Sequence, residues 1–230
     1  PMREEVYNRH VAFATADGGV WAEPVQPLNG RRILTLDGDK GWQGRQMRGE
    51  RIPAYEKFDA KNRHLLDHWA VWNGFRLSQT TADAFSIRKR THADRSWIGT
   101  FSGTRAPGYV FAGDVSGGLG VALKDFWQSY PTALQVDNAA ARNAHLTVWM
   151  WSPDAEPMDL RHYDDVAHDL EASYEDVQEG MSTPYGVART HTLTLVPSVA
   201  YGGKETVART AAMLAEDAPL LCTPEYLYAK

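Results

Sequence analysis

The sequence predicts an all-β fold: a large antiparallel β-sandwich followed by one C-terminal helix. Short runs rich in Val, Ile, Thr, Phe and Trp are separated by Gly, Pro, Asn or Asp, which is typical of strands and turns. Several runs alternate polar and apolar residues, as strands with one buried face do. Helical spacing of apolar residues is scarce, and its best case is Lys204 to Glu216. Ten or more short strands with one late helix favour a sandwich.

The expected strands follow one another between turn signals. Asn73 to Arg90 has two alternating halves around Thr80 to Asp83, which predicts a hairpin. Gly113 to Gly120 lacks the ending of a phosphate-binding loop and precedes a strand, so we interpret it as a β-turn. Further strands are expected at His10 to Thr15, Arg31 to Leu36, Trp97 to Ser102, Tyr109 to Ala112, Val121 to Lys124, Ala133 to Asp137, His145 to Trp151 and Thr190 to Val196.

The character of the chain changes after Ser198, from alternating β to helix. We therefore expect a β-sandwich domain over residues 1–200 and a helical segment over residues 201–230 that leads to another domain. A shorter stretch, Asp164 to Glu171, has a weaker helical pattern.

Composition excludes several classes of protein. The 230 residues include 24 Lys and Arg against 29 Asp and Glu, a formal charge of −5, which argues against a dedicated nucleic-acid binder. Cys222 is the only cysteine, so the chain has no internal disulfide and no cysteine-based zinc site. No apolar run approaches the roughly 20 residues of a membrane span. The sequence leaves secreted, periplasmic and cytoplasmic locations open.

Metal and nucleophile motifs are weak. His64 and His68 have the spacing of zinc ligands on a helix, but the Glu of the zincin motif is missing, so a surface histidine pair is the favoured interpretation. No G-x-S-x-G nucleophile motif occurs. We expect no cofactor, although the 29 acidic residues leave calcium open without an EF-hand loop.

Arg88 and Arg90 are candidate ligands for an anion. They stand two residues apart in an expected strand, so alternation places both on one face. Two like charges there are either splayed into water or gathered around an anion, and a guanidinium matches a carboxylate with two hydrogen bonds. Both interpretations remain open from the sequence.

Two further segments have the composition of a sugar site. Lys124 to Thr132 contains Lys124, Trp127 and Tyr130, and such mixtures of rings, charges and amides line saccharide sites. The alternative is a core strand with buried rings. Trp149 to Tyr163 is a strand leading into a polar loop that carries Arg161, His162 and Tyr163, a charge and two groups able to move protons. The alternative there is a structural loop whose acids pair with its own arginine.

These residues also resemble a known family. The resemblance rests on FRLSQTTADAFSIRKRT (75–91), KDFWQSYPT (124–132), WMWSPDAEPMDLRHY (149–163) and TPYGVARTHTL (183–193). They are similar to the YetA-like, exo-rhamnogalacturonan lyase-like family of multidomain proteins. The resemblance implies an N-terminal barrel, a central β-sandwich and a C-terminal α/α toroid. The present chain is similar to the central sandwich, from about Trp69 to Val196, and Gly202 to Lys230 looks like the junction with the toroid.

The resemblance implies a uronate-containing polysaccharide of the rhamnogalacturonan type, a pectin component, cleaved by β-elimination. A cation must then neutralise the uronate carboxylate, while a base and an acid move protons. On chemical grounds we expect substrate binding by Arg88, Arg90, Lys124, Trp127, Tyr130 and Arg161, and catalysis by His162 and Tyr163. The isolated domain is expected to be inactive as an enzyme.

Two alternatives come from other classes of function. The first is a non-catalytic carbohydrate-binding or scaffolding module that supports a neighbouring catalytic domain. The second is an accessory domain of a glycoside hydrolase, for which Asp154 and Glu156 are too close in sequence to make an argument. Nucleic-acid and membrane partners are not expected.

Overall fold

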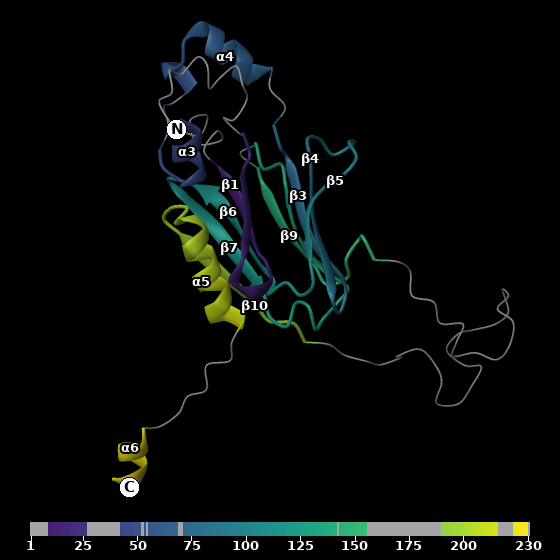
Figure 1. Ribbon diagram of the computed structural model, residues 1–230, viewed down its shortest axis with the longest axis vertical. Helices are drawn as coiled ribbons and strands as arrows, with labels where there is room; N and C mark the ends of the chain where they lie inside the picture. Colours follow the sequence, from purple (N-terminus) through teal and green to yellow (C-terminus); the bar gives the residue numbers. More distant parts are fainter. Residues whose placement is uncertain are drawn as a thin grey trace, which may run out of the picture.

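Two five-stranded antiparallel sheets face each other in the computed structural model (Figure 1), which confirms the predicted sandwich. The structure describes residues 9–26, 42–51, 53, 55–68, 71–141, 143–155, 190–215 and 223–229. Sheet A contains, in spatial order, β10 (Leu193–Ser198), β7 (Gly117–Leu123), β6 (Tyr109–Asp114), β1 (His10–Ala14) and β2 (Val20–Pro24). Sheet B contains β5 (Ile98–Gly103), β4 (Ala84–Arg90), β3 (Gly74–Thr81), β8 (Thr132–Asp137) and β9 (His145–Trp149).

The main core lies between the sheets. Phe75 and Leu77 of β3 are fully buried there, together with Ile87 of β4. Because side chains alternate along a strand, Arg76 and Ser78 of β3 project from the opposite, outer face of sheet B. The expected hairpin is confirmed, since β3 and β4 pair antiparallel around a short turn. Strand alternation therefore produces an apolar inner face and a polar outer face on the same sheet.

A lysine joins the two sheets at their edge. Lys89 lies between Arg88 and Arg90 in sequence, so it projects to the opposite face, toward sheet A. Its Nζ contacts the Glu23 carboxylate of β2 and lies 4.0 Å from the centre of the Trp72 ring. Of three consecutive cations, one therefore stabilises the sandwich and two reach the outer face of sheet B.

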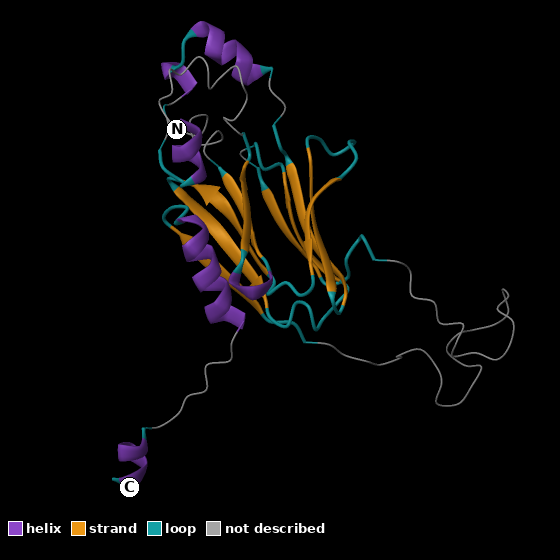
Figure 2. Cartoon of the chain, viewed as in Figure 1, coloured by secondary structure: helices purple, strands orange, loops and turns teal. Residues whose placement is uncertain are grey.

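Helix α5 (Gly203–Ala215) covers the outer face of sheet A (Figure 2) and confirms the predicted helix to within one residue at each end. Val207 and Ala211 of the helix pack in a second apolar cluster with Ala12, Ala14 and Phe111 of the sheet. The small side chains of the strand let the helix backbone approach the sheet closely.

The glycine-rich stretch between β6 and β7 is mostly strand, not turn. The turn itself is only Val115 and Ser116, and Asp114 accepts hydrogen bonds there from the Ser116 N and Oγ at 2.8 and 2.7 Å. Gly113 and Gly118 pair across the ladder, and a Cβ at Gly118 would lie 2.4 Å from Cζ of Phe111. These glycines make room for a ring, which a turn prediction misses.

Several short elements were not expected, and two expected elements lie outside the described residues. Helix α4 begins after Asp59, whose carboxylate accepts a hydrogen bond from Asn62 N at 2.8 Å. The helix buries only Asn62 and Leu66. Because so few apolar residues are needed for this packing, the sequence shows little apolar periodicity there. Two expected elements lie outside the described residues: the strand at Arg31 to Leu36 and the helix at Asp164 to Glu171. The unexpected elements are β2, η1 (Ala16–Gly18), α3 (Trp42–Met47), η2 (Tyr55–Lys57) and α4 (Ala60–Asp67). Helix α6 (Pro224–Tyr228) lies within the segment that we expect to be helical.

Among the residues that the structure describes, no helix has the length and apolar character needed to cross a membrane.

Tyr201 provides a pH-dependent test of the packing beneath α5. The ring is 5% exposed, stacks on His10 with ring centres 4.5 Å apart, and its hydroxyl has no hydrogen-bond partner among the described residues. Burial raises the pKa of Tyr201 to about 12. Since the folded chain favours the neutral phenol, this stabilising contribution is complete below about pH 10 and is lost as pH rises from about 10 toward 12.

We expect Tyr201→Phe to remove most of this loss, which is about 2 to 3 kcal/mol between pH 9 and 12 by the same linkage. At pH 7 the variant should be as stable as the original chain or more so, because it no longer buries a hydroxyl without a partner. Urea unfolding at a series of pH values measures both effects. An unchanged pH profile in the variant would show that the phenol is solvated.

Candidate functional site

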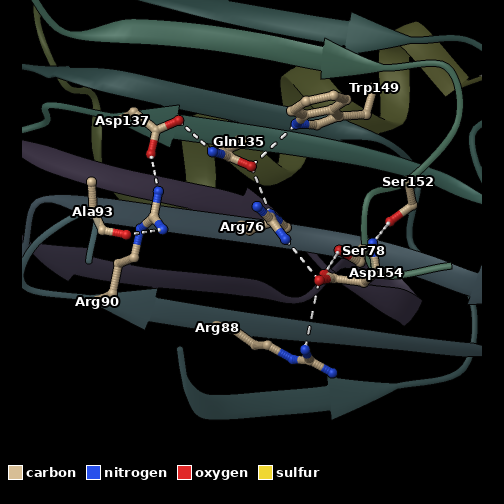
Figure 3. Close-up of polar contacts among 10 residues, drawn as sticks. All are labelled: Arg76, Ser78, Arg88, Arg90, Ala93, Gln135, Asp137, Trp149, Ser152 and Asp154. Carbon is tan, nitrogen blue, oxygen red and sulfur yellow. Dashed lines mark hydrogen bonds and ion pairs between the residues drawn. The ribbon is translucent and has the colours of Figure 1, made fainter. Parts of the chain in front are cut away.

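The outer face of sheet B carries a connected group of polar side chains from four strands and the turn after β9 (Figure 3). Arg76 of β3 lies opposite Arg88 of β4 on one side and opposite Gln135 of β8 on the other. We call the group the outer-face cluster. Its members from the strands and this turn are Arg76, Ser78, Arg88, Arg90, Gln135, Asp137, Trp149 and Asp154, and Trp97 joins it from the connection between β4 and β5.

Arg76 and Asp154 form the buried centre of the cluster. Arg76 Nη1 donates to Asp154 Oδ1 at 2.7 Å, and Arg76 Nε donates to Gln135 Oε1 at 2.6 Å. Ser78 Oγ donates to the second carboxylate oxygen of Asp154 at 2.5 Å. Only 10% and 11% of the Arg76 and Asp154 side chains are exposed. This ion pair is therefore shielded from water and carries the hydrogen bonds that burial of charge requires.

The turn after β9 brings Asp154 to this position. Asp154 N donates to Ser152 Oγ at 3.2 Å, and Ser152 N donates to Pro131 O at 2.9 Å. The second bond sets Trp151 beside the turn that contains Tyr130. Both rings are about half exposed, at 49% and 45%. Two accessible aromatic residues therefore stand next in sequence to the two residues that this bond joins.

Arg90 and Arg76 flank Trp97. Their guanidinium carbons lie 4.2 and 4.4 Å from the centre of the Trp97 indole, distances at which cations are attracted to an aromatic face. Arg90 also donates to Asp137 Oδ1 at 3.0 Å and to Ala93 O at 2.9 Å. The guanidinium of Arg90 is therefore held on three sides by the chain itself.

Arg88 differs from both neighbours. Its Nη1 lies 3.7 Å from Asp154 Oδ1, too far for a hydrogen bond, and 39% of its side chain is exposed. No hydrogen bond of the Arg88 guanidinium is found within the described residues. The pairing of β4 with β5 shifts register between Ile87 and Arg88, and Thr100 Oγ1 donates to Ile87 O at 3.0 Å. Such bulges redirect side chains. Here the bulge lies at Arg88, the arginine of the cluster with the fewest hydrogen bonds to the chain.

Three guanidinium groups meet two carboxylates in the outer-face cluster, so it has an excess of positive charge. The alternation predicted for Arg88 and Arg90 is confirmed, since both project from the outer face. Of the two arginines, Arg90 is paired with a carboxylate of the chain and Arg88 is in part exposed, so binding of an anion by Arg88 stays a prediction.

Lys124 and Trp127 lie elsewhere. Trp127 has the Arg105 guanidinium 4.3 Å above its ring and lines a cavity beside α5, away from Arg88 and Arg90. Lys124 N donates to Thr192 O at the start of the chain segment that forms β10. The candidates Arg161, His162 and Tyr163 lie outside the described residues.

The histidine pair at the C-terminal end of α4 (Ala60–Asp67) has the arrangement of a surface pair. The ring centres of His64 and His68 lie 4.1 Å apart, and Nδ1 of His68 is 2.8 Å from His64 O. Within the described ranges, no group of three or more His, Cys, Asp or Glu side chains could hold a metal ion.

Sequence reasoning did not single out Arg76, Ser78, Trp97 or Gln135. One available signal was the hairpin itself, which sets Arg76 opposite Arg88 and so requires a counter-ion for two adjacent cations. Asp154 supplies that counter-ion from 78 residues away, and no local pattern indicates this contact.

The chain is a two-sheet β-sandwich domain with a charged outer face. It is a member of the family of PcRGLX-like protein central beta sandwich domains, whose model matches residues 1–212. This confirms the resemblance to rhamnogalacturonan lyase-like proteins. The chain is also 32% identical over 238 residues to a Bacillus subtilis (strain 168) protein described as uncharacterized protein YetA. The match covers 99% of this chain and 26% of the relative, so the chain spans about a quarter of that protein's length.

Proposed function

We propose that the outer face of sheet B binds a uronate-containing polysaccharide of the rhamnogalacturonan type and forms one wall of a substrate cleft. The observation that supports this most is Arg88, the one guanidinium of the cluster for which no hydrogen bond is found within the described residues, whereas Arg76 and Arg90 each bond to a carboxylate. A uronate carboxylate matches the fork of such a guanidinium. The exposed rings of Trp151 and Tyr130 near Asp154 are suited to stacking on the apolar faces of sugars.

Chemically, this arrangement suits β-elimination in a multidomain parent protein. Removal of the C5 proton of a uronate is easier when the adjacent carboxylate is neutralised, and Arg88 would supply that positive charge. His162 and Tyr163 remain our proposed proton-transfer groups, with Arg161 as a further cation. Residues 201–230 would lead toward the catalytic toroid, and an N-terminal barrel would precede the sandwich.

Arg88→Gln tests the binding proposal in this chain. The variant keeps a polar side chain but removes the charge, so we expect about tenfold weaker binding of a galacturonate-containing oligosaccharide, measured by isothermal titration calorimetry. Arg95→Gln is the matched control, because it makes the same charge change at a side chain that is 73% exposed and outside the cluster. Equal affinity in the original chain and in Arg88→Gln, with both folded, would contradict the proposal.

A scaffolding role is the second candidate, and the buried Arg76 guanidinium favours it, since its bonds to Gln135 and Asp154 join β3 to β8 and to the turn after β9. Activity of the multidomain parent on rhamnogalacturonan, followed by absorbance of the unsaturated product, separates the two. Folded Arg88→Ala, Lys124→Ala and His162→Ala variants that all keep full activity would favour the scaffold.

A further inference from the structure

A cavity of about 220 Å³ lies between α5, the turn joining β1 to β2, and the loop that follows β7. It shares no residue with the outer-face cluster. It is smaller than the roughly 300–1,000 Å³ of pockets that hold drug-sized ligands, so its size suits a single ring. Its polar lining includes Asp17, Arg105, Asp125, Trp127 and Gln128.

One side of the cavity is apolar. Ala208, Ala211, Ala212 and Ala215 recur at helical spacing and present one face of α5 to it. Trp127 also lines the cavity, and the Arg105 guanidinium carbon lies 4.3 Å from the centre of its ring. An indole and a row of methyl groups form a suitable surface for the C–H face of a sugar.

The charges in the cavity decide what kind of ligand fits. The carboxylates of Asp17 and Asp125 have no ion pair or hydrogen bond within the described residues, and Arg105 has no carboxylate partner there. The lining carries two carboxylates against one guanidinium, so an anionic ligand is disfavoured. A neutral ligand with several hydroxyl groups suits both kinds of charge, because each hydroxyl donates to a carboxylate or accepts from the guanidinium.

We infer that this cavity is a binding site for one neutral pyranose ring, separate from the uronate-binding face. Trp127 and the alanine face of α5 contact the apolar side of the ring. Asp17, Asp125 and Arg105 hold its hydroxyl groups. The inference does not depend on the proposed function, since the two sites share no side chain and select ligands of different charge.

The test is a titration of the ¹⁵N-labelled chain with the methyl glycosides of glucose, galactose, mannose and a 6-deoxyhexose, observed by NMR. Trp127→Phe assigns the indole N–H signal of Trp127. We expect at least one neutral glycoside to shift this signal to saturation. Methyl galactosiduronate, which carries a carboxylate, should bind more weakly than methyl galactoside, because it meets Asp17 and Asp125.

Two variants locate the binding. Asp125→Asn removes one carboxylate and keeps the left-handed backbone of this residue (φ 54°), which Asn adopts readily. Ala212→Leu fills the cavity from an exposed helix position. Each should weaken the glycoside by about tenfold. Met213→Leu, next in the helix and 71% exposed, and Arg88→Gln should leave it unchanged.

Three results would overturn the inference: no saturating shift with any of the neutral glycosides, tighter binding of the uronate than of the matching neutral sugar, or full binding retained in both folded Asp125→Asn and Ala212→Leu. A chain that binds neutral glycosides but not galacturonate oligosaccharides would keep this inference and contradict the proposed function instead.

Discussion

Replacing Asp154 by Ala should lower the free energy of unfolding by about 3 kcal/mol, because it leaves the buried Arg76 guanidinium without its counter-ion. Arg76 and Asp154 are each about one-tenth exposed, so water cannot replace the missing carboxylate easily. Ser78 and Gln135 remain, but Ser78 loses its acceptor and Gln135 is neutral. Equilibrium unfolding in urea, monitored by circular dichroism, measures the loss.

A second ion pair on the same face is the control. Asp137→Ala should cost less, because 28% of the Asp137 side chain is exposed and Arg90 keeps its bond to Ala93 O and its contact with Trp97. The double variant Arg76→Leu with Asp154→Ala should recover much of the loss, since it removes the buried charge altogether. A cost of under about 0.5 kcal/mol for Asp154→Ala would mean that the pair is screened by solvent and contributes little.

Gly108→Ala should also destabilise the chain strongly, by about 3 kcal/mol or more, because strain and steric overlap act together. Gly108 has a φ of 80°, and a Cβ there would lie 2.2 Å from Cβ of Phe126 and 2.7 Å from Leu123 O. Neither neighbour can move freely: Phe126 is buried in the core, and Leu123 N donates to Gly108 O at 2.9 Å. Urea unfolding of the variant provides the measurement.

Gly203→Ala separates the two causes. Gly203 has the same φ of 80°, but a Cβ there meets no atom within 4 Å, so only backbone strain remains, about 1 kcal/mol. The difference between the two variants is the cost of the overlap at Phe126. Equal losses in both would mean that the loop around Gly108 relaxes without cost.

Strands and the helix with strong local patterns could be predicted from the sequence. The hairpin of β3 and β4 alternates clearly and ends at a turn signal, and α5 carries an apolar stripe. Strand β2 was missed because its residues, Val20–Pro24, are mostly half-buried and end in a proline, a pattern that favours an edge strand and carries little periodicity.

The candidate site could be predicted only in part. Alternation sets Arg88 and Arg90 on one face. It does not reveal that Arg76 forms an ion pair with Asp154 and that Arg90 forms one with Asp137. The segment around Trp127 has the composition of a sugar site, yet the Trp127 ring packs against the guanidinium of Arg105, which comes from a different loop. Such pairings depend on how the two sheets and α5 come together, and no local pattern records them.

The most direct test of a uronate-binding outer face compares two forms of one ligand: a galacturonate oligosaccharide with free carboxylates and its methyl ester. The proposal predicts that the free acid binds more tightly, that the difference shrinks as salt is added, and that Arg88→Gln abolishes it. Equal affinity for acid and ester, unaffected by salt, would contradict the claim that this face recognises the charge of the saccharide.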